Sequence, residues 1–333
     1  WTNFATRSVA RYKTETQGID SIMYRITDRR HTDQMIAAVN RGVPVRLISE
    51  PEQYRSTGKY WHSWNIDRMY MAGVQIKHRL HAGQNHEKLT ILHRDTAGNH
   101  MTILGSSNWT SASAASQQEH NRFTSENWIY DWVVKHFNRK WNNTGPVPET
   151  QPFAPLPPNT PSNRSPANGA QDQPTSVTLK WHAGFWAHKY DVYIGTSPSN
   201  MTKVLTDREL GPSTSASNLK SWTDTGLAAG TTYYWKVTGR TMANLERTGA
   251  TWSFRTAGTG GPPPGSCGAL PSGWTGADTG GVGATGTSCY SGGTFTVEGS
   301  GADIWGSADE FRFVYRAMTG DGYIIARVDS VES

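Results

Sequence analysis

Two short motifs lie close together in the sequence and carry side chains that could act on a phosphodiester. His86 and Lys88 are two residues apart at the start of an apolar run, so on a β-strand both side chains leave from one face. A turn at 95–99 would return residues 105–108 to the same end as a hairpin. An imidazole can act as nucleophile or general acid, and ammonium, hydroxyl and carboxamide groups can hold phosphate oxygens as charge develops. The predicted site therefore consists of His86, Lys88, Ser106, Ser107 and Asn108.

Two simpler interpretations compete with this site. A His-x-Lys pair alone is most often a solvated strand edge, but the second motif at hairpin distance favours a site. A metal centre is disfavoured by the histidine spacing: His81, His86, His93 and His100 match neither His-x-His nor His-x3-His. We therefore expect no metal.

The segments before the motifs must position them, and they alternate between strand and helix patterns. We predict strand, helix, strand, helix and strand, in the order 19–26, 28–41, 43–48, 61–72 and 74–80. This alternation implies parallel strands with right-handed crossovers. The hairpin follows, and a helix at 126–141 closes the segment. Residues 1–143 are thus predicted to be an α/β domain, a mainly parallel sheet flanked by helices.

These residues resemble the phospholipase D superfamily, whose motif is His-x-Lys-x4-Asp followed by Gly-Ser-x-Asn. His86-Glu87-Lys88 and Gly105-Ser106-Ser107-Asn108 match it, Trp109-Thr110 continue it, and the resemblance covers about 1–143. It implies hydrolysis of a phosphodiester, in a phospholipid or a nucleic acid, through a phosphohistidine on His86 and without a cofactor. Lys88, Ser106 and Asn108 would hold the phosphoryl oxygens, and Glu119 would orient the imidazole.

The sequence departs from the family pattern in two ways. His93 stands where the family has Asp, and we expect this to weaken local bonding more than chemistry; the nearest acid is Asp95, in the predicted turn. The family's active site also needs two motifs, whereas this sequence has one His-x-Lys. The second would come from a homodimer partner or from upstream sequence. Because the chain starts at Trp1 without Met and stops within a strand pattern, we interpret it as a fragment and favour the upstream source.

The rest of the chain has a β pattern. Pro-rich spacers are predicted at 144–166 and 258–265, separated by a segment at 167–257 that resembles a fibronectin type III-like sandwich. In that segment Trp181 would be the buried strand Trp and Tyr233 the tyrosine-corner residue.

Residues 266–333 resemble, more loosely, the opening of a lectin-like jelly-roll, a truncated all-β module with a predicted strand at 323–331. Its Cys267 and Cys289 could form one disulfide in an oxidising compartment. A glycan or cell-surface ligand is the partner such β modules suggest.

Tryptophans outside the motifs are expected to pack rather than bind. Trp128, Trp132 and Trp141 have helical spacing, which favours a place in the core. Trp186 and Trp305 are less constrained and could stack on sugars.

Composition narrows the class of protein. Charged residues are 18% of the chain, with 34 Gly, 17 Pro and 14 Trp, which is typical of secreted β-rich modules. No run of 18 apolar residues, heptad repeat or charge block is present. Residues 1–145 hold 19 basic and 12 acidic side chains, a net charge of +7 that suits a polyanion. We predict a secreted or cell-surface phosphodiesterase; the alternative is a catalytically degenerate scaffold used for binding.

Overall fold

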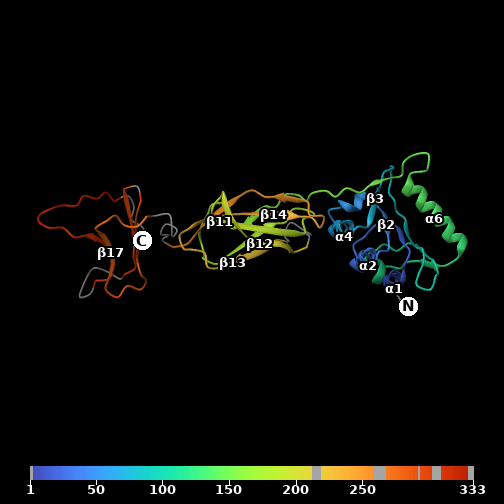
Figure 1. Ribbon diagram of the computed structural model, residues 1–333, viewed down its shortest axis with the longest axis horizontal. Coiled ribbons are helices and arrows are strands. Elements are labelled where there is room, and N and C mark those ends of the chain that lie inside the picture. Colours follow the sequence, from blue (N-terminus) through green and yellow to red (C-terminus); the bar gives the residue numbers. More distant parts are fainter. Residues whose placement is uncertain (1–2, 212–218, 259–267, 292, 302–308, 329–333) are drawn as a thin grey trace.

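The computed structural model describes residues 3–211, 219–258, 268–291, 293–301 and 309–328. Figure 1 shows three parts that follow one another along the long axis: an α/β domain, a β-sandwich and a smaller β part. The first carries the predicted site.

The α/β domain is built on a seven-stranded sheet of order β6-β5-β4-β1-β2-β3-β7. Its strands are β1 (Ile19–Met23), β2 (Val45–Ser49), β3 (Gln75–Arg79), β4 (Lys88–Leu92), β5 (Met101–Gly105), β6 (Asn121–Thr124) and β7 (Thr150–Pro152). Strands β1, β2 and β3 are parallel, as predicted, but the other four pairings are antiparallel. The expectation of a mainly parallel sheet is therefore wrong. The sheet is mixed because β4 follows β3 through a loop and pairs antiparallel with β1, and β5 and β6 continue the antiparallel order.

Helices cover both faces of this sheet (Figure 1). They are α1 (Phe4–Thr14), α2 (Arg29–Asn40), α3 (Pro51–Tyr54), α4 (Tyr60–Met71), α5 (Ser111–Ala115) and α6 (Asn127–Asn142). Alternate strand residues face opposite ways, so Leu47 packs with α1, α2 and α4 on one face. Its neighbour Ile48 packs with α6 on the other. The domain thus has two apolar layers, one on each side of the sheet.

The predicted helices and strands of this domain are confirmed to within a few residues at their ends. Helix α2 begins after Asp28, whose carboxylate accepts from the Arg30 amide at 2.9 Å. Gly42 and Gly73 follow α2 and α4 with φ of +82° and +95°. Helix α1 was not predicted; it packs Tyr12 against the core.

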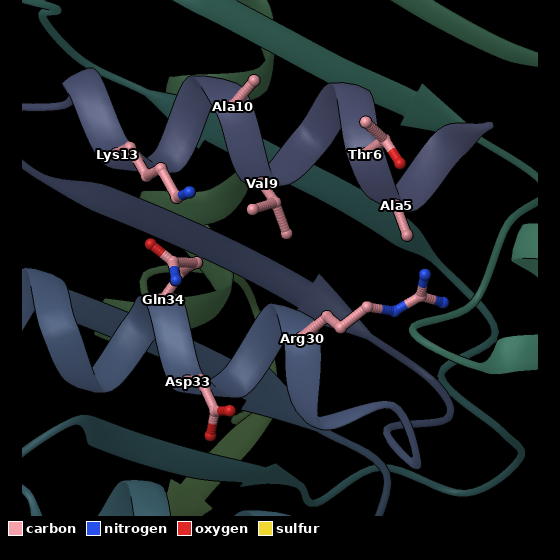
Figure 2. Close-up of a pocket in the computed structure, with 8 residues that line it drawn as sticks. All are labelled: Ala5, Thr6, Val9, Ala10, Lys13, Arg30, Asp33 and Gln34. Atoms are coloured by element: carbon pink, nitrogen blue, oxygen red, sulfur yellow. The ribbon is translucent and has the colours of Figure 1, made fainter. Parts of the chain in front are cut away.

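A shallow groove of about 410 Å³ lies between α1 and α2 (Figure 2). Val9 and Ala10 of α1 line one wall, and Arg30 and Gln34 of α2 line the other. It contains none of the predicted site residues.

The segment predicted as a spacer at 144–166 is largely part of the two domains. Strand β7 pairs with β3, and Phe153 is buried in the first core. Strand β8 (Ser162–Ser165) belongs to the second domain. The proline content hid these contacts, because prolines are tolerated on sheet edges such as β7. The second predicted spacer, 258–265, lies almost entirely outside the described residues.

The second domain is a two-sheet sandwich, as predicted. One sheet has the order β13-β10-β8 and the other β12-β11-β14-β16-β9, with β15 beside β14. The strands are β9 (Ala170–Gln173), β10 (Val177–His182), β11 (Lys189–Ser197), β12 (Asn200–Glu209), β13 (Lys220–Asp224), β14 (Thr232–Arg240), β15 (Glu246–Thr248) and β16 (Trp252–Thr256). Trp181 is fully buried between the sheets, and the Tyr233 hydroxyl accepts from the Ala228 amide at 2.9 Å, as expected of a tyrosine corner.

The third part contains two antiparallel strand pairs in its described residues: β17 (Trp274–Thr279) with β20 (Phe311–Arg316), and the hairpin of β18 (Thr287–Ser291) with β19 (Thr294–Glu298). The predicted strand at 323–331 is not formed over 323–328, where no described residue pairs with it, and 329–331 lie outside the described residues. Cys289, on β18, is disulfide-bonded. Its predicted partner Cys267 lies outside the described residues, and the lectin-like fold stays a prediction.

None of the helices in the described part of the chain combines the length and the apolar character needed to cross a membrane.

Candidate active site

The two motifs meet at one edge of the seven-stranded sheet. Strand β4 starts there, with Lys88 opposite Met23 at the end of β1. Strand β5 ends there, with Gly105 opposite Asn121 at the start of β6. The antiparallel hairpin therefore brings the end of one motif beside the start of the other, at the carboxyl ends of the parallel strands.

His86 and Lys88 form the centre of this edge. The Lys88 ammonium lies 2.8 Å from His86 Nδ1, and Lys88 is 8% exposed while His86 is open to solvent. Burial lowers the pKa of Lys88 to about 8; nearby Glu119 opposes this shift and Arg25 adds to it. Burial and the cations Lys88 and Arg25 also lower the pKa of His86. A neutral imidazole beside a cation is the state needed for attack on an anion.

The hydrogen bond between these residues sets the tautomer of the imidazole. Because Lys88 donates to Nδ1, a neutral His86 carries its proton on Nε2. Attack by Nε2 requires the proton to move from Nε2 to Nδ1. The hydrogen bond from Lys88 Nζ to Nδ1 must then break. A phosphate oxygen is a stronger acceptor than the imidazole, so a bound substrate would draw Lys88 away.

Asn108 presents its amide N–H groups to the site. Its Oδ1 accepts from the Arg25 backbone amide at 3.2 Å, and its own backbone amide donates to Ser113 Oγ at 3.2 Å. With Oδ1 occupied, the Nδ2 donors have no partner among the described residues. They are available to a phosphate oxygen, and the role of Asn108 in binding the substrate stays a prediction.

Glu119 lies in the site but contacts different groups from those predicted. Its carboxylate accepts from Ser106 Oγ and from Ser113 Oγ, the latter at 2.8 Å. No hydrogen bond joins it to His86 among the described residues, so the expected orienting bond is absent from this structure. Glu119 instead fixes the loop that carries Asn108, and its charge favours a protonated Lys88.

The two motif serines differ in accessibility. Ser106 is exposed, although its hydroxyl proton is engaged by Glu119. Ser107 is fully buried, and its Oγ accepts from Asn121 Nδ2 at 2.7 Å. The prediction that Ser107 binds substrate is therefore wrong, because consecutive residues of an extended segment point opposite ways.

Gly105 is required by a close approach of two chain segments. Its φ is +157°, and a Cβ placed there would lie 2.2 Å from the His120 backbone oxygen. The motif glycine thus lets β5 end tightly against the start of β6.

Three residues that sequence reasoning missed complete the site. The Tyr24 ring centroid lies 4.4 Å from that of His86, 5.1 Å from Lys88 Nζ and 5.4 Å from Arg25 Cζ. Gln53, on α3, donates to the Tyr24 hydroxyl at 3.0 Å and accepts from Arg25 Nε at 2.9 Å. Their position after β1 and β2, at the carboxyl ends of parallel strands, is the signal that could have identified them.

A buried ion pair shapes the loop that leads into His86. Glu50 binds Arg79 through two contacts of 2.8 and 2.9 Å and accepts from the Asn85 amide at 2.8 Å. Although burial opposes it, the hydrogen bonds from Arg79 and Asn85 lower the pKa of Glu50. The carboxylate stays charged and holds the residue next to His86.

His93, which replaces the family's Asp, lies at the opposite edge of the sheet. It is five residues from Lys88, roughly 16 Å along a strand. Its ring nitrogens contact Asp20 Oδ2 at 2.8 Å and the Tyr130 hydroxyl at 2.7 Å. Local bonding is thus retained rather than weakened. Asp95 lies in the β4–β5 turn, where it accepts from backbone amides.

Several tryptophans do not lie where the sequence predicts. Trp141 is buried, but Trp128 and Trp132 on α6 are 67% and 61% exposed, so the expectation of core packing is wrong for both. The helix turns only one stripe toward the sheet, and these two lie outside it. Trp186 packs under the Arg55 guanidinium, 4.5 Å from its ring centroid, and its stacking on a sugar stays a prediction; Trp305 lies outside the described residues.

Comparison with known proteins is consistent with this geometry. Residues 13–141 match the family model described as cardiolipin synthase, PLD-like domain. The chain is 24% identical over 127 residues to a mitochondrial cardiolipin hydrolase of Chlamydomonas reinhardtii, covering 38% of this chain and 52% of that protein. The chain therefore spans about half the length of this curated relative.

Two solved structures are similar to separate parts of the chain. Nuc from Salmonella typhimurium, described as a phospholipase D family member, has 16% identity and a TM-score of 0.38, covering 44% of this chain and 89% of that one. An Fn3-like protein from Clostridium thermocellum has 22% identity and a TM-score of 0.22, covering 28% and 93%.

Proposed function

Residues 13–141 are a phospholipase D-like domain, and we propose that this domain hydrolyses a phosphodiester through a phosphohistidine on His86. The observation that carries the proposal is the cluster at the sheet edge. It joins an accessible imidazole, a buried ammonium whose pKa is lowered to about 8, and an open carboxamide donor within two motifs of the matched segment.

The reaction proceeds in two displacements. His86 Nε2 attacks phosphorus while the ester oxygen leaves with a proton from a general acid. Lys88 and Asn108 Nδ2 hold non-bridging oxygens as negative charge develops on them. Water then attacks the phosphohistidine, losing a proton to the same group, and releases a phosphomonoester and free His86.

The general acid is a second histidine of the same kind. The sequence has one His-x-Lys motif, so a homodimer partner or another segment of the protein supplies it. Glu119 supports the reaction by fixing the loop of Ser106 and Asn108 and by keeping Lys88 charged. Phospholipid and nucleic acid both fit the net charge of +7 over residues 1–145.

We also propose that the protein works outside the reducing cytoplasm. Cys289 is disulfide-bonded, and disulfides persist chiefly in oxidising compartments. In that setting the β modules attach the enzyme to a glycan or a cell surface.

The test is hydrolysis of bis-p-nitrophenyl phosphate by the full-length protein, which includes any segment that supplies the second histidine, and by its His86→Ala variant. We expect loss of at least about a thousandfold in rate, because the nucleophile is removed. His182→Ala, on the second domain, is the matched control. If the wild type and His86→Ala hydrolyse equally, or if neither hydrolyses, the enzymatic proposal is wrong and a binding scaffold is favoured.

A further inference from the structure

Arg25 is a cation of the site to which neither the two motifs nor the proposed mechanism gives a role. It follows β1 and forms no ion pair with any carboxylate of the described residues. Its Cζ and Lys88 Nζ lie 5.4 and 5.1 Å from the centroid of the same Tyr24 ring. The positive charge of Arg25 has no carboxylate partner among the described residues, so it is available to an anion at this site.

The Arg25 side chain is held in place before any ligand arrives. Its Nε donates to Gln53 Oε1 at 2.9 Å, and its backbone oxygen accepts from the Trp109 amide at 3.1 Å. The terminal Nη groups have no partner among the described residues. A guanidinium anchored through Nε and open at its Nη groups presents a fork that matches two phosphate oxygens.

The anchor places this fork on a different side of the site from the motif residues. Gln53 follows β2, whereas Lys88 starts β4 and Asn108 follows β5. In the sheet β1 lies between β2 and β4. A phosphate held by Lys88 and Asn108 therefore lies toward β4 and β5. Arg25 lies toward β2, where it would face the neighbouring phosphate of the same substrate.

We propose that Arg25 is a specificity-determining residue that binds a second phosphate beside the scissile phosphodiester. The inference rests on the proposed function and names its substrate class: molecules with two neighbouring phosphates. A nucleic-acid strand and a lipid with two phosphodiesters share this chemistry, whereas a single phosphodiester lacks it.

The experiment compares substrates that differ only in the second phosphate. One pair is thymidine 5′-(p-nitrophenyl phosphate) with and without a 3′-phosphate; the other is cardiolipin against phosphatidylglycerol in mixed micelles. For the wild type we expect kcat/KM to be about tenfold or more higher for the member with two phosphates, since a charge-assisted contact is worth that much. The pair that shows the preference identifies the source of the substrate.

Arg25→Gln should lower kcat/KM about tenfold for the member with two phosphates and leave the other nearly unchanged, and Arg25→Lys should restore part of the preference. Arg29→Gln, on the exposed start of α2, is the matched control. Thermal unfolding of each variant checks that the fold is retained. An equal loss on both members of a pair, or no preference in the wild type, would overturn the inference.

Binding separates this inference from the proposed function. Titration calorimetry with thymidine 3′,5′-bisphosphate and thymidine 5′-monophosphate needs no turnover. We expect the wild type to bind the bisphosphate about tenfold more tightly than the monophosphate. Arg25→Gln should bind the two ligands with equal affinity. If the wild type hydrolyses nothing, the proposed function fails, and the binding comparison alone decides the role of Arg25. Equal affinities of the wild type for the two ligands would rule out a second phosphate site at Arg25.

Discussion

At the residue scale, the site depends on a lysine that is charged only over part of the neutral range. Burial at the start of β4 lowers the pKa of Lys88 to about 8, against an ordinary value of 10.5. The ammonium is therefore present below pH 8 and is lost as the pH rises. Since only the ammonium attracts the phosphate strongly, substrate binding and transition-state stabilisation share this dependence.

We predict that kcat/KM falls above about pH 8 and that Lys88→Arg moves this limb to higher pH. A guanidinium stays charged up to about pH 12, so the variant, although slower, keeps its cation. A kcat/KM profile from pH 6 to 10 for both proteins is the measurement. An alkaline limb at the same pH in Lys88→Arg would show that another group controls it.

At the element scale, two hairpin-like returns of the chain assemble the site. Strand β4 pairs antiparallel with β1, and β5 pairs antiparallel with β4 and β6, so starts and ends of strands meet at one edge. Gly105 is the tightest point of this arrangement, since the His120 backbone oxygen lies where a side chain would begin.

We predict that Gly105→Ala destabilises the domain by about 2–4 kcal/mol, because backbone rather than a flexible side chain must move. Gly98→Ala is the matched control: its φ is +87°, but nothing lies within 4 Å of its Cβ position, so the cost is about 1 kcal/mol. Urea unfolding of both variants gives the comparison. Equal destabilisation of the two variants would mean that backbone strain at positive φ, and not the close approach of His120, is the reason glycine is required at position 105.

At the scale of the whole molecule, the first two domains are in direct contact. Trp64 Nε1 donates to Glu209 Oε1 at 2.6 Å, and the Tyr60 and Phe185 rings stack with centroids 5.6 Å apart. Short helix α3 joins this contact to the site, because Gln53 holds Arg25 while Tyr54, the next residue, donates to buried Asp67 at 2.7 Å. The sandwich therefore supports the element that positions Arg25.

Asp67 makes this region sensitive to pH. Burial raises its pKa to about 7, and Tyr54 and the Ala243 amide only partly offset that shift. The pKa of this carboxyl is higher in the folded state than its value near 3.8 in the unfolded state. The protonated carboxyl therefore contributes its full stabilisation below about pH 3.8, and this stabilisation is lost as the pH rises through about 7.

We predict that Asp67→Asn gains stability relative to the wild type as the pH increases from 4 to 8, on the order of 3 kcal/mol, because the buried charge is removed. Unfolding free energies at the two pH values test this, and the change between them isolates the charge from any effect of the amide. Asp131→Asn, exposed on α6, should show no such trend. A difference that stays constant with pH would contradict the prediction.

Much of the architecture was predictable because its determinants are local. The alternating strand and helix patterns, the glycines that end α2 and α4, the β4–β5 turn and the two-motif spacing each follow from residues near in sequence. The sandwich was predictable for the same reason, from short alternating runs between turns. Its Trp181 and Tyr233 have the burial and the hydrogen bond that the pattern predicts.

The features that the sequence did not predict correctly depend on contacts between segments that are distant in the chain. Strand β7 escaped prediction because only its pairing with β3, about 70 residues earlier, gives it a role. Helical spacing does not say which stripe of α6 the sheet covers, so it does not distinguish exposed Trp128 and Trp132 from buried Trp141. The bonds of Glu119 could not be inferred because the motif gives its position but not the rotamers of Ser106 and Ser113.

The sequence by itself determined the chemical groups of this protein: the imidazole, ammonium and carboxamide of two motifs, and the order of its domains. Only the tertiary structure decided how those groups are used. It buried Ser107, turned Glu119 to two serines, moved His93 to the far edge of the sheet and brought Tyr24, Arg25 and Gln53 beside His86. Local patterns specify strands and helices, but the direction of a side chain at a strand end depends on how neighbouring strands pair.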